Sequence, residues 1–590
     1  MAADQSILVV GAGPAGLSTA ILLRQRGYQP IVVDRRTSLT SLPAAHVVNT
    51  RSQEILAEMG LAEIVRDQGD PTALSSLVAW VESMAGREYG LLPIQGSAID
   101  ERGPLSAFCS VNIPQNRFEA LLHQRFVELG GTVRLGQEVL GVENHAHGAR
   151  VTIRSVADGR ESVVDCGWVI GCDGAGSAVR RAMDIEMEGP RSLARFMTIY
   201  FRADLDRFRE GRRGMLYWIG GRDARGVFIC FDKEGRTWAM LVPIGDLPPE
   251  TFDEAAARAI VSKAIGCGQV PVELIGLSNW NMSAQVAAAY RRDRVFLVGD
   301  ACHRFPPTGG LGMNTGIQDA HNLVWKLAAV MEERAPSALL DSYELERRPV
   351  AQRNTDQSVR NLRKMALIDE ALGIETLAPI AADAGEGPIA AYPAERLLID
   401  GDSPLAMARR GGVQRAVDEQ AEHFAQGAGM DLGFSYVQGA FIPDGSLPPS
   451  CAPCDYRADA HPGARLPFAS ASGDFGDSTL GKVQPRGVTL FTFNAAWTGV
   501  VAVVSAESGV PVEIVMLDRA SSGASVLDLL GIDPGGAVAV RPDGHVCWRT
   551  PTFPPDPRTA LGRAVRVSHG LQDPLSVRPA AAPAFEAICT

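Results

Sequence analysis

The sequence contains little cysteine for its length. Ten cysteines are spread over 590 residues, and most stand alone, which argues against a disulfide-stapled secreted scaffold and fits a reducing compartment. Cys451 and Cys454 form a CxxC pair. The pair lies in a proline-rich stretch, without a second CxxC and without the strand–helix setting of a redox motif, so we interpret it as incidental.

Long apolar runs are missing as well. No stretch approaches the roughly 18 unbroken apolar residues that a membrane-spanning helix needs. The first apolar run covers residues 7–10, stops at Gly11 and follows no basic segment, so it is too short for a signal-peptide core. We therefore expect a soluble, cytoplasmic protein.

Basic residues are in the minority. The chain has 56 Lys and Arg against 68 Asp and Glu, a net charge of −12. A surface this acidic repels phosphate backbones, which argues against nucleic acid as the main partner. The remaining composition, 46% hydrophobic and 21% charged, is that of a folded globular chain. Its length predicts roughly three or four domains.

The most informative motif that is present is a glycine-rich turn near the N-terminus. Residues 6–10 predict a buried strand, residues 17–26 a helix, and residues 30–34 a second buried strand. The turn between the first strand and the helix reads GAGPAG. A strand, turn, helix and strand in this order are typical of a dinucleotide-binding βαβ unit.

The positions of this motif have separate physical roles. Gly11 permits a tight turn, Gly13 lets the backbone approach a pyrophosphate, and Gly16 lets the helix pack closely on the strand. Asp34 is placed to accept a hydrogen bond from a ribose hydroxyl, and two arginines follow it. The candidate cofactor-binding residues of this unit are Gly11, Gly13, Pro14, Ala15, Gly16, Asp34 and Arg35.

Two later segments suit a flavin, whereas a second strand–GxGxxG–helix unit is lacking. Residues 171–177 close a strand and open a helix, and Gly299-Asp300 ends another strand. Asp300 is placed to bond ribityl hydroxyls. The turn at residues 306–314 would aim backbone N–H groups and a helix dipole at an anionic flavin ring. The candidates are Asp173, Gly299, Asp300, Pro307, Gly310, Gly312, Met313 and Asn314.

The three motifs GAGPAG, CDGAGS and VGDACHRFPPTGGLGMN, in this order and at these distances, resemble those of the class A flavoprotein aromatic hydroxylases. The phrases HVVNTRSQEILAEMG, GIQDAHNLVWKL, PGARLPF and VRPDGHVCWR are similar to the branch of phenol hydroxylase and 2,4-dichlorophenol 6-monooxygenase. The resemblance covers nearly the whole chain, and it is far more specific for fold and cofactor than for substrate.

The expected fold is α/β with three parts. A discontinuous Rossmann-type FAD-binding domain covers residues 1–185 and 285–400, and short strand-like runs predict an inserted antiparallel substrate sheet at 186–284. Residues 430–590 form a small α/β domain, which the resemblance implies to be thioredoxin-like without redox cysteines. Its predicted strands are residues 488–493, 500–504, 512–517 and 537–541.

The resemblance implies a monooxygenase chemistry. FAD is bound, NADPH or NADH binds transiently to reduce it, and O2 adds at flavin C4a to give a hydroperoxide that transfers one oxygen to a phenolic or electron-rich heteroaromatic ring. The flavin carries the oxygen chemistry, while the protein orients the ring and excludes water. The expected partner is a small aromatic substrate, and a homo-oligomer is expected.

A base is needed because a phenolate is more electron-rich than a phenol. His46 is the candidate, because the dichlorophenol branch has a histidine in this segment and an imidazole titrates near neutrality. The alternative is that His46 only packs or bonds backbone. Tyr217 lies on the predicted sheet and is a candidate to hydrogen-bond the substrate, with a buried structural tyrosine as the alternative.

Three more cofactor contacts are carried over from the resemblance. Arg51 would reach the flavin or its pyrophosphate, Gln115 would contact the cofactor from the start of a helix, and Val139 would lend backbone near the adenine. Asp173 would serve FAD and the passing nicotinamide. His303 is expected to fix its turn rather than to catalyse.

Two alternative functions remain open from the sequence. Relatives with the same flavin perform Baeyer–Villiger or oxidative decarboxylation steps. A flavin-binding assembly protein without activity is the other alternative, against which the intact glycines and aspartates speak.

Overall fold

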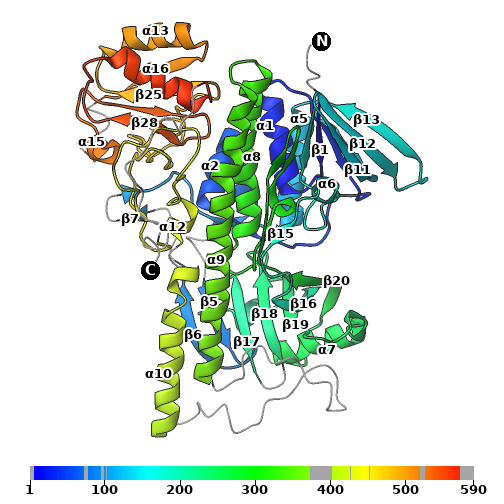
Figure 1. Ribbon diagram of the computed structural model, residues 1–590. Helices are drawn as coiled ribbons and strands as arrows, with labels where there is room; N and C mark the ends of the chain where they lie inside the picture. Colours follow the sequence, from blue (N-terminus) through cyan, green and yellow to red (C-terminus); the bar gives the residue numbers. More distant parts are fainter. Residues whose placement is uncertain are drawn as a thin grey trace.

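A computed structural model describes residues 6–71, 77–94, 99–100, 103–221, 224–372, 402–424, 427–450, 452–518 and 525–571. Figure 1 shows a nucleotide-binding part at the upper right, a large sheet below it, and a C-terminal part at the upper left. Helices α8 (Leu311–Met331) and α9 (Asp341–Leu372) run between these parts. Cys451, half of the CxxC pair, lies outside the described residues.

The nucleotide-binding part is built on a six-stranded sheet of order β10-β2-β1-β14-β23-β22. All pairs are parallel except β22 with β23. Strands β1 and β14 are buried along their whole length, as expected for parallel strands covered on both faces. The strands are β1 (Ile7–Val10), β2 (Ile31–Asp34), β10 (Val133–Leu135), β14 (Trp168–Gly171), β22 (Arg291–Arg292) and β23 (Val295–Leu297).

Several helices and two small antiparallel sheets complete this part. Helix α1 (Pro14–Gln25) follows β1, as the glycine turn predicts, and packs against α8 and α5. The accompanying elements are α2 (Thr50–Glu58), α3 (Ala62–Gln68), α5 (Gln115–Glu128), α6 (Ala178–Ala182), the sheet β11 (Gln137–His145), β12 (Gly148–Ser155) and β13 (Glu161–Cys166), and the sheet β3 (Val47–Val48), β9 (Val111–Asn112) and β4 (Asp70–Pro71).

The large sheet has seven strands in the order β20-β16-β19-β18-β17-β5-β6. Its range was predicted as 186–284, but β5 and β6 come from the N-terminal segment, and β5 pairs in parallel with β17. Such a long-range pairing has no local sequence signal. The strands are β5 (Leu77–Val81), β6 (Glu88–Pro93), β16 (Ala194–Arg202), β17 (Leu216–Gly220), β18 (Arg225–Cys230), β19 (Thr237–Pro243) and β20 (Glu273–Met282).

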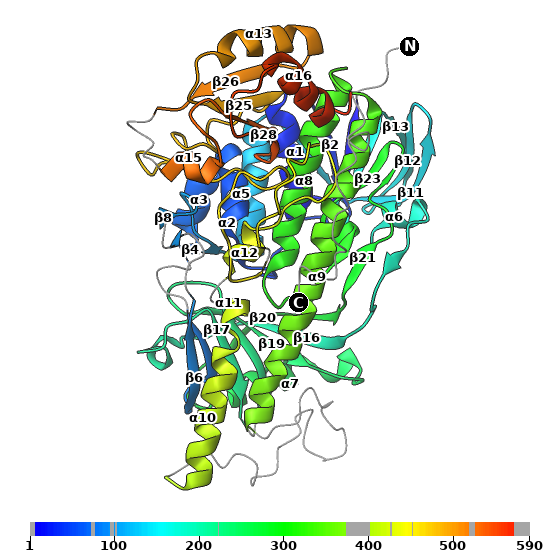
Figure 2. The ribbon, with the colours of Figure 1, turned by 60° about the vertical axis from the view of Figure 1, so that its left-hand side comes forward.

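The two faces of the large sheet are covered differently. Helix α7 (Glu254–Ile265) packs on one face in a core that includes Tyr217 and Trp238. On the other face, Trp218 packs with the end of α9 and with α10 (Pro404–Asp418). Figure 2 shows α9 and α10 side by side below the nucleotide-binding part.

The C-terminal part is a four-stranded sheet of order β26-β25-β27-β28 with helices between its strands. Strands β25 and β26 are parallel, and β27 and β28 are antiparallel to their neighbours. This β-α-β-α-β-β-α order is the thioredoxin-like arrangement. The elements are β25 (Val488–Thr492), α13 (Trp497–Ser508), β26 (Val512–Met516), α15 (Ser525–Leu530), β27 (Ala537–Val540), β28 (Val546–Thr550) and α16 (Pro557–Ser568).

The predicted strand at residues 500–504 is wrong, because these residues lie inside helix α13. The valine-rich run favours a strand by local preference. Trp497, Val501 and Val504 are nevertheless buried at helical spacing, whereas Val503 is exposed. Packing of this face, with Gly509 in a left-handed conformation after the helix, outweighs the local preference.

Buried ion pairs join the C-terminal part to the helices. Glu346 of α9 accepts from Arg541 at 2.6 Å and from Lys326 of α8 at 2.7 Å, and all three side chains are fully buried. Glu54 of α2 is paired in the same way with Arg465.

Among the described residues, no helix is both long and apolar enough to cross a membrane.

Candidate active site

The glycine turn after β1 leaves space where a ligand would have to lie. A Cβ on Gly11 would stand 2.3 Å from the carbonyl oxygen of Cys172, and one on Gly16 would stand 1.9 Å from that of Gly11. Both glycines are therefore required by packing. A Cβ on Gly13 would meet no described atom within 4 Å apart from its chain neighbours. The N-terminus of α1 thus borders open space, which fits a pyrophosphate.

Asp34 at the end of β2 is already held by protein donors. Its carboxylate accepts from the Ala12 N–H at 2.7 Å and from the Arg36 guanidinium at 2.9 Å. Burial raises the pKa of Asp34, but these hydrogen bonds outweigh it and hold the pKa below its ordinary value. Arg36 also pairs with Glu119 at 2.9 Å, whereas Arg35 is exposed. The arginine beside the predicted ribose-binding carboxylate is thus Arg36.

Asp173 of the second motif caps a helix. Its carboxylate accepts from the Ser177 hydroxyl at 2.5 Å and from the N–H groups of Ala178 and Val179 at 2.6 and 3.2 Å. These bonds satisfy the first turn of α6. The motif therefore shapes the turn after β14, which lies directly beside Gly11.

The third motif opens helix α8 through two glycines with positive φ. Gly309 has φ 117° and Gly310 has φ 65°, backbone conformations that residues other than glycine rarely adopt. A Cβ on Gly310 would lie 3.3 Å from Val47. The Asn314 amide donates to the Val47 carbonyl and accepts from the Asn49 N–H, both at 2.9 Å. The N-terminus of α8 is thereby fixed against the segment that carries His46.

Gly299 and Asp300 lie between the first and third motifs. A Cβ on Gly299 would be 3.0 Å from the Ala15 Cβ and 3.6 Å from Gly316, so α1, α8 and this turn meet closely. Asp300 is accessible to solvent yet surrounded by protein, and the loss of bulk water raises its carboxyl pKa. Such a carboxylate suits hydroxyl donors of a ligand.

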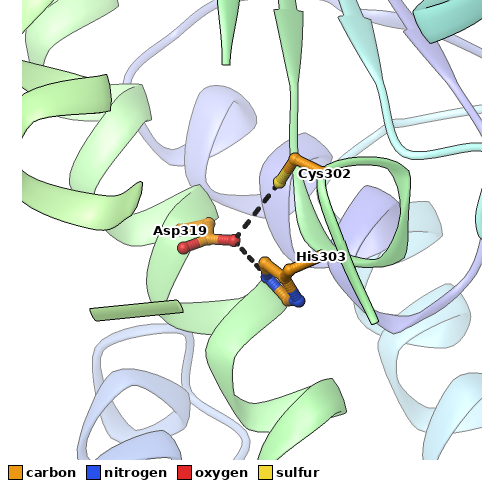
Figure 3. Close-up of side chains that lie close together, drawn as sticks. All are labelled: Cys302, His303 and Asp319. Carbon is orange, nitrogen blue, oxygen red and sulfur yellow. Dashed lines mark hydrogen bonds and ion pairs between the residues drawn. The ribbon is translucent and has the colours of Figure 1, made fainter. Parts of the chain in front are cut away.

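His303 is a structural residue of this turn. Its Nε2 lies 2.8 Å from an Asp319 carboxylate oxygen, and the Cys302 thiol lies 4.0 Å from the same oxygen, as Figure 3 shows. These three groups are close enough to hold a metal ion. Arg347, however, donates to Asp319 at 2.7 Å with both side chains fully buried. The positive guanidinium already balances this carboxylate, so the cluster is an ion-pair network that fixes the turn.

His46 lies between the α8 turn and the large sheet. Its Nδ1 is 3.0 Å from the Asn112 amide oxygen, and its ring meets Phe231 edge-on at 5.8 Å between centroids. Burial lowers the pKa of His46 to about 4, although the Asn112 hydrogen bond opposes this shift. The imidazole is therefore neutral near pH 7, and burial makes it a weaker base than the near-neutral imidazole expected from the sequence.

Other predicted cofactor contacts are placed in different ways. The Gln115 side chain accepts from the Ala45 N–H at 3.2 Å, which ties α5 to the His46 segment. Val139 packs in the core at the β11 bulge. Arg51 does not face the glycine turns. Its guanidinium is held by Glu54 at 2.9 Å and by the Asp543 carbonyl at 2.8 Å, because this face of α2 contacts the C-terminal part.

Tyr217 is a structural residue, contrary to its candidate catalytic role. Its side chain is fully buried on the α7 face. Its hydroxyl donates to the Arg212 carbonyl at 3.0 Å and accepts from the Gly214 N–H at 2.8 Å. Side chains alternate along a strand, so residues 216 and 218 lie on the opposite face of the sheet. Tyr217 is structural because it lies on the face that α7 covers.

The sequence prediction missed the residues on that opposite face. Tyr200, Ile229 and Phe231 form a buried cluster there, with Leu216 and Trp218 packed against it. The Trp218 indole N–H is buried and meets no acceptor among the described residues. Alternation along the strands could have identified the face, but only the fold shows that His46 lies against it. Asn112 was missed because nothing in its local sequence marks it.

Comparison with known proteins agrees with this geometry. A family model described as FAD binding domain matches residues 4–358. 2,4-Dichlorophenol 6-monooxygenase of Cupriavidus pinatubonensis is 32% identical, covering 96% of this chain and 97% of that protein. Phenol 2-monooxygenase of a Pseudomonas strain is 30% identical, covering 95% and 92%. The crystal structure of the flavin-dependent monooxygenase PieE with FAD and substrate has a TM-score of 0.86 at 30% identity, covering 96% and 99%.

Proposed function

This chain belongs to the FAD-binding domain family of flavoprotein monooxygenases, and from that membership we propose how it hydroxylates an aromatic ring. It is an FAD-dependent monooxygenase that consumes NAD(P)H. One oxygen atom of O2 enters the substrate and the other leaves as water, while NAD(P)H and a proton supply the two electrons and two hydrogens. The substrate is a phenol or an electron-rich heteroaromatic compound.

The observation that carries this proposal is the meeting of three glycine turns at one sheet edge. The turns follow β1, β14 and β23, which are neighbouring parallel strands. Gly11 lies against Cys172, and Ala15 lies against Gly299. The carboxyl edge of such a sheet is where α/β folds bind dinucleotides. The open space in front of Gly13 leaves room for the FAD pyrophosphate. The accessible carboxylate of Asp300 supplies an acceptor for FAD hydroxyl groups.

We assign the cofactor contacts by this geometry. The first turn of α1 would hold the pyrophosphate, Asp34 the adenosine ribose and Asp300 the ribityl chain. The N-terminal turn of α8 would present Gly312 and Met313 N–H groups to the ring, where a helix dipole stabilises negative charge. Bound FAD supplies the redox chemistry, accepting electrons from reduced nicotinamide and activating O2.

The protein's own groups would prepare the substrate. His46 would take the phenolic proton at Nε2 and hold it while the ring is hydroxylated. The face of Tyr200, Trp218 and Phe231 would stack against the aromatic ring and exclude water. The proposal also includes NADPH or NADH as the reductant, a homo-oligomeric state and a cytoplasmic location. None of the eight cysteines that the structure describes is in a disulfide bond.

The test uses purified yellow holoenzyme. Phenolic and heteroaromatic compounds should accelerate NADPH or NADH oxidation, and 18O2 should place one labelled atom in the product. His46→Ala should lower product formed per NAD(P)H consumed more than it lowers the rate of flavin reduction. If no aromatic compound accelerates oxidation, the hydroxylase proposal fails and the assembly-protein alternative gains support. A lactone or a decarboxylated product would indicate the other oxidative alternatives.

A further inference from the structure

A single amide joins His46 to the large sheet. The Asn112 Nδ2 donates to the Cys230 carbonyl at 3.0 Å, and its Oδ1 lies 3.0 Å from the His46 Nδ1. Asn112 is 5% exposed. The chain of contacts runs from the end of β18, through the amide, to the imidazole.

The position of this amide is fixed by backbone on both sides. Asn112 is in β9, which pairs with β3 at Val47 and with β4 at Asp70. The next N–H, that of Ile113, donates to the His46 carbonyl at 2.7 Å. The segment carrying the imidazole and the strand carrying the amide are therefore fastened together, so the backbones that bear the two side chains hold a fixed relation to each other.

The Cys230 carbonyl decides which way the amide points. A carbonyl only accepts, so it must face the NH2 group of Asn112. The amide oxygen then faces His46, and an amide oxygen only accepts. A neutral imidazole carries one N–H and one lone pair, so the proton lies on Nδ1 and the lone pair on Nε2.

We propose that Asn112 is a positioning residue that fixes the tautomer and ring orientation of His46, so that Nε2 is the proton acceptor for a phenolic substrate. The proposal rests on the proposed function for its substrate, whereas the tautomer itself does not depend on it. The proton passes from the substrate oxygen to Nε2, and the Asn112 oxygen stabilises the resulting imidazolium through Nδ1–H.

The first experiment reads the tautomer directly. The protein, with FAD bound, is labelled with 15N-histidine, and the signals of His46 among the ten histidines are assigned by their loss in His46→Gln. Wild type should show a protonated Nδ1 and an unprotonated Nε2 near pH 7. Asn112→Leu should lose this single tautomer. A wild-type proton on Nε2, or an unchanged tautomer in Asn112→Leu, would overturn the proposal.

The second experiment separates positioning from attachment to the sheet. Asn112→Leu and Asn112→Asp both lose the donor to Cys230, but only Asp keeps an acceptor facing His46. Asn112→Leu should lower the kcat of hydroxylation at least about tenfold with little change in KM, and NAD(P)H oxidation should then release hydrogen peroxide. Asn112→Asp should recover most of the coupling between NAD(P)H oxidation and hydroxylation. Equal loss in both variants, or no loss in either, would refute the positioning role.

Asn116 offers a matched control, because its exposed amide donates to the Ser41 carbonyl at 3.1 Å without touching His46. Asn116→Leu should keep the wild-type coupling, and a loss as large as that of Asn112→Leu would count against the proposal. If no aromatic compound stimulates the wild-type enzyme, the proposed function fails, whereas the tautomer measurement still decides the role of Asn112.

Discussion

The carboxylate of Glu346 and the guanidinium of Arg541 form a bidentate ion pair, at 2.6 and 3.0 Å, with both side chains fully buried. Glu346 is in the long helix α9, and Arg541 directly follows β27 of the thioredoxin-like sheet. Arg541 and Lys326 hold the pKa of Glu346 below its ordinary value, against the effect of burial. The pair thus ties the C-terminal part to the nucleotide-binding part.

Removing one partner of this pair should be costly. Glu346→Gln leaves the buried Lys326 without its paired carboxylate and removes one of the two carboxylates paired with Arg541, Asp543 being the other, so we expect a loss of about 3–5 kcal/mol. Calorimetry should show the lowest unfolding transition shifted down by several degrees. Glu507→Gln, which breaks an exposed pair with Arg558, is the control and should cost less than about 1 kcal/mol. Equal shifts would mean that the buried pair is not a main attachment.

Gly13→Ala should separate folding from cofactor binding. The added methyl group meets open space within the protein, so the melting temperature of the apoprotein should stay near that of wild type. It intrudes where the pyrophosphate would lie, so the dissociation constant for FAD should rise at least about tenfold. Gly499→Ala, in equally open space on α13, should leave FAD binding unchanged. FAD titration followed by fluorescence measures the dissociation constants of both variants. Unchanged affinity in Gly13→Ala would show that the pyrophosphate does not bind at this turn.

Asp300→Ala should weaken FAD retention, because the ribityl hydroxyls lose their carboxylate acceptor. The purified variant should carry less flavin per chain, measured from the absorbance of released FAD. Asp300→Asn keeps the shape and one acceptor oxygen, and it should retain more flavin than the alanine variant. Full flavin content in Asp300→Ala would show that the ribityl assignment is wrong.

Tyr217→Phe should lower stability without slowing hydroxylation. The variant leaves the buried Gly214 N–H without its hydroxyl acceptor, at a cost of about 1–3 kcal/mol. The kcat should be unchanged because the side chain lies on the α7 face of the sheet. Thermal unfolding and steady-state hydroxylation are the measurements, and a stable but slow variant would restore the catalytic interpretation.

Acid should destabilise the protein partly through His569. Burial lowers the pKa of this histidine to about 3, so the unfolded chain binds a proton that the folded chain does not. The contribution of His569 to the free energy of unfolding is complete above the unfolded-state pKa near 6.5 and is lost as pH falls toward 3. At pH 5 the loss is about 2 kcal/mol. His569→Leu should therefore lose less stability between pH 7 and pH 5 than wild type. Equal losses, measured by chemical unfolding, would contradict the assignment.

The sequence determined the edge of the sheet at which we propose that FAD binds. Glycine is almost irreplaceable where backbone touches other backbone, as at Gly11 and Gly16, and it is favoured where φ is positive, as at Gly310. The turns around these residues are therefore recognisable in the sequence as motifs. The strand–turn–helix order then predicted the parallel sheet, and the motifs carried the resemblance to flavoprotein hydroxylases.

Only the tertiary structure decided which side chains face the candidate active site. Tyr217 and Trp218 are neighbours in sequence, and their opposite roles depend on where α7 packs. Arg51 faces the C-terminal part because of Asp543, nearly 500 residues away, and Asn112 meets His46 because β3 and β9 pair. These contacts arise from long-range packing, whose energy depends on partners that no local pattern contains.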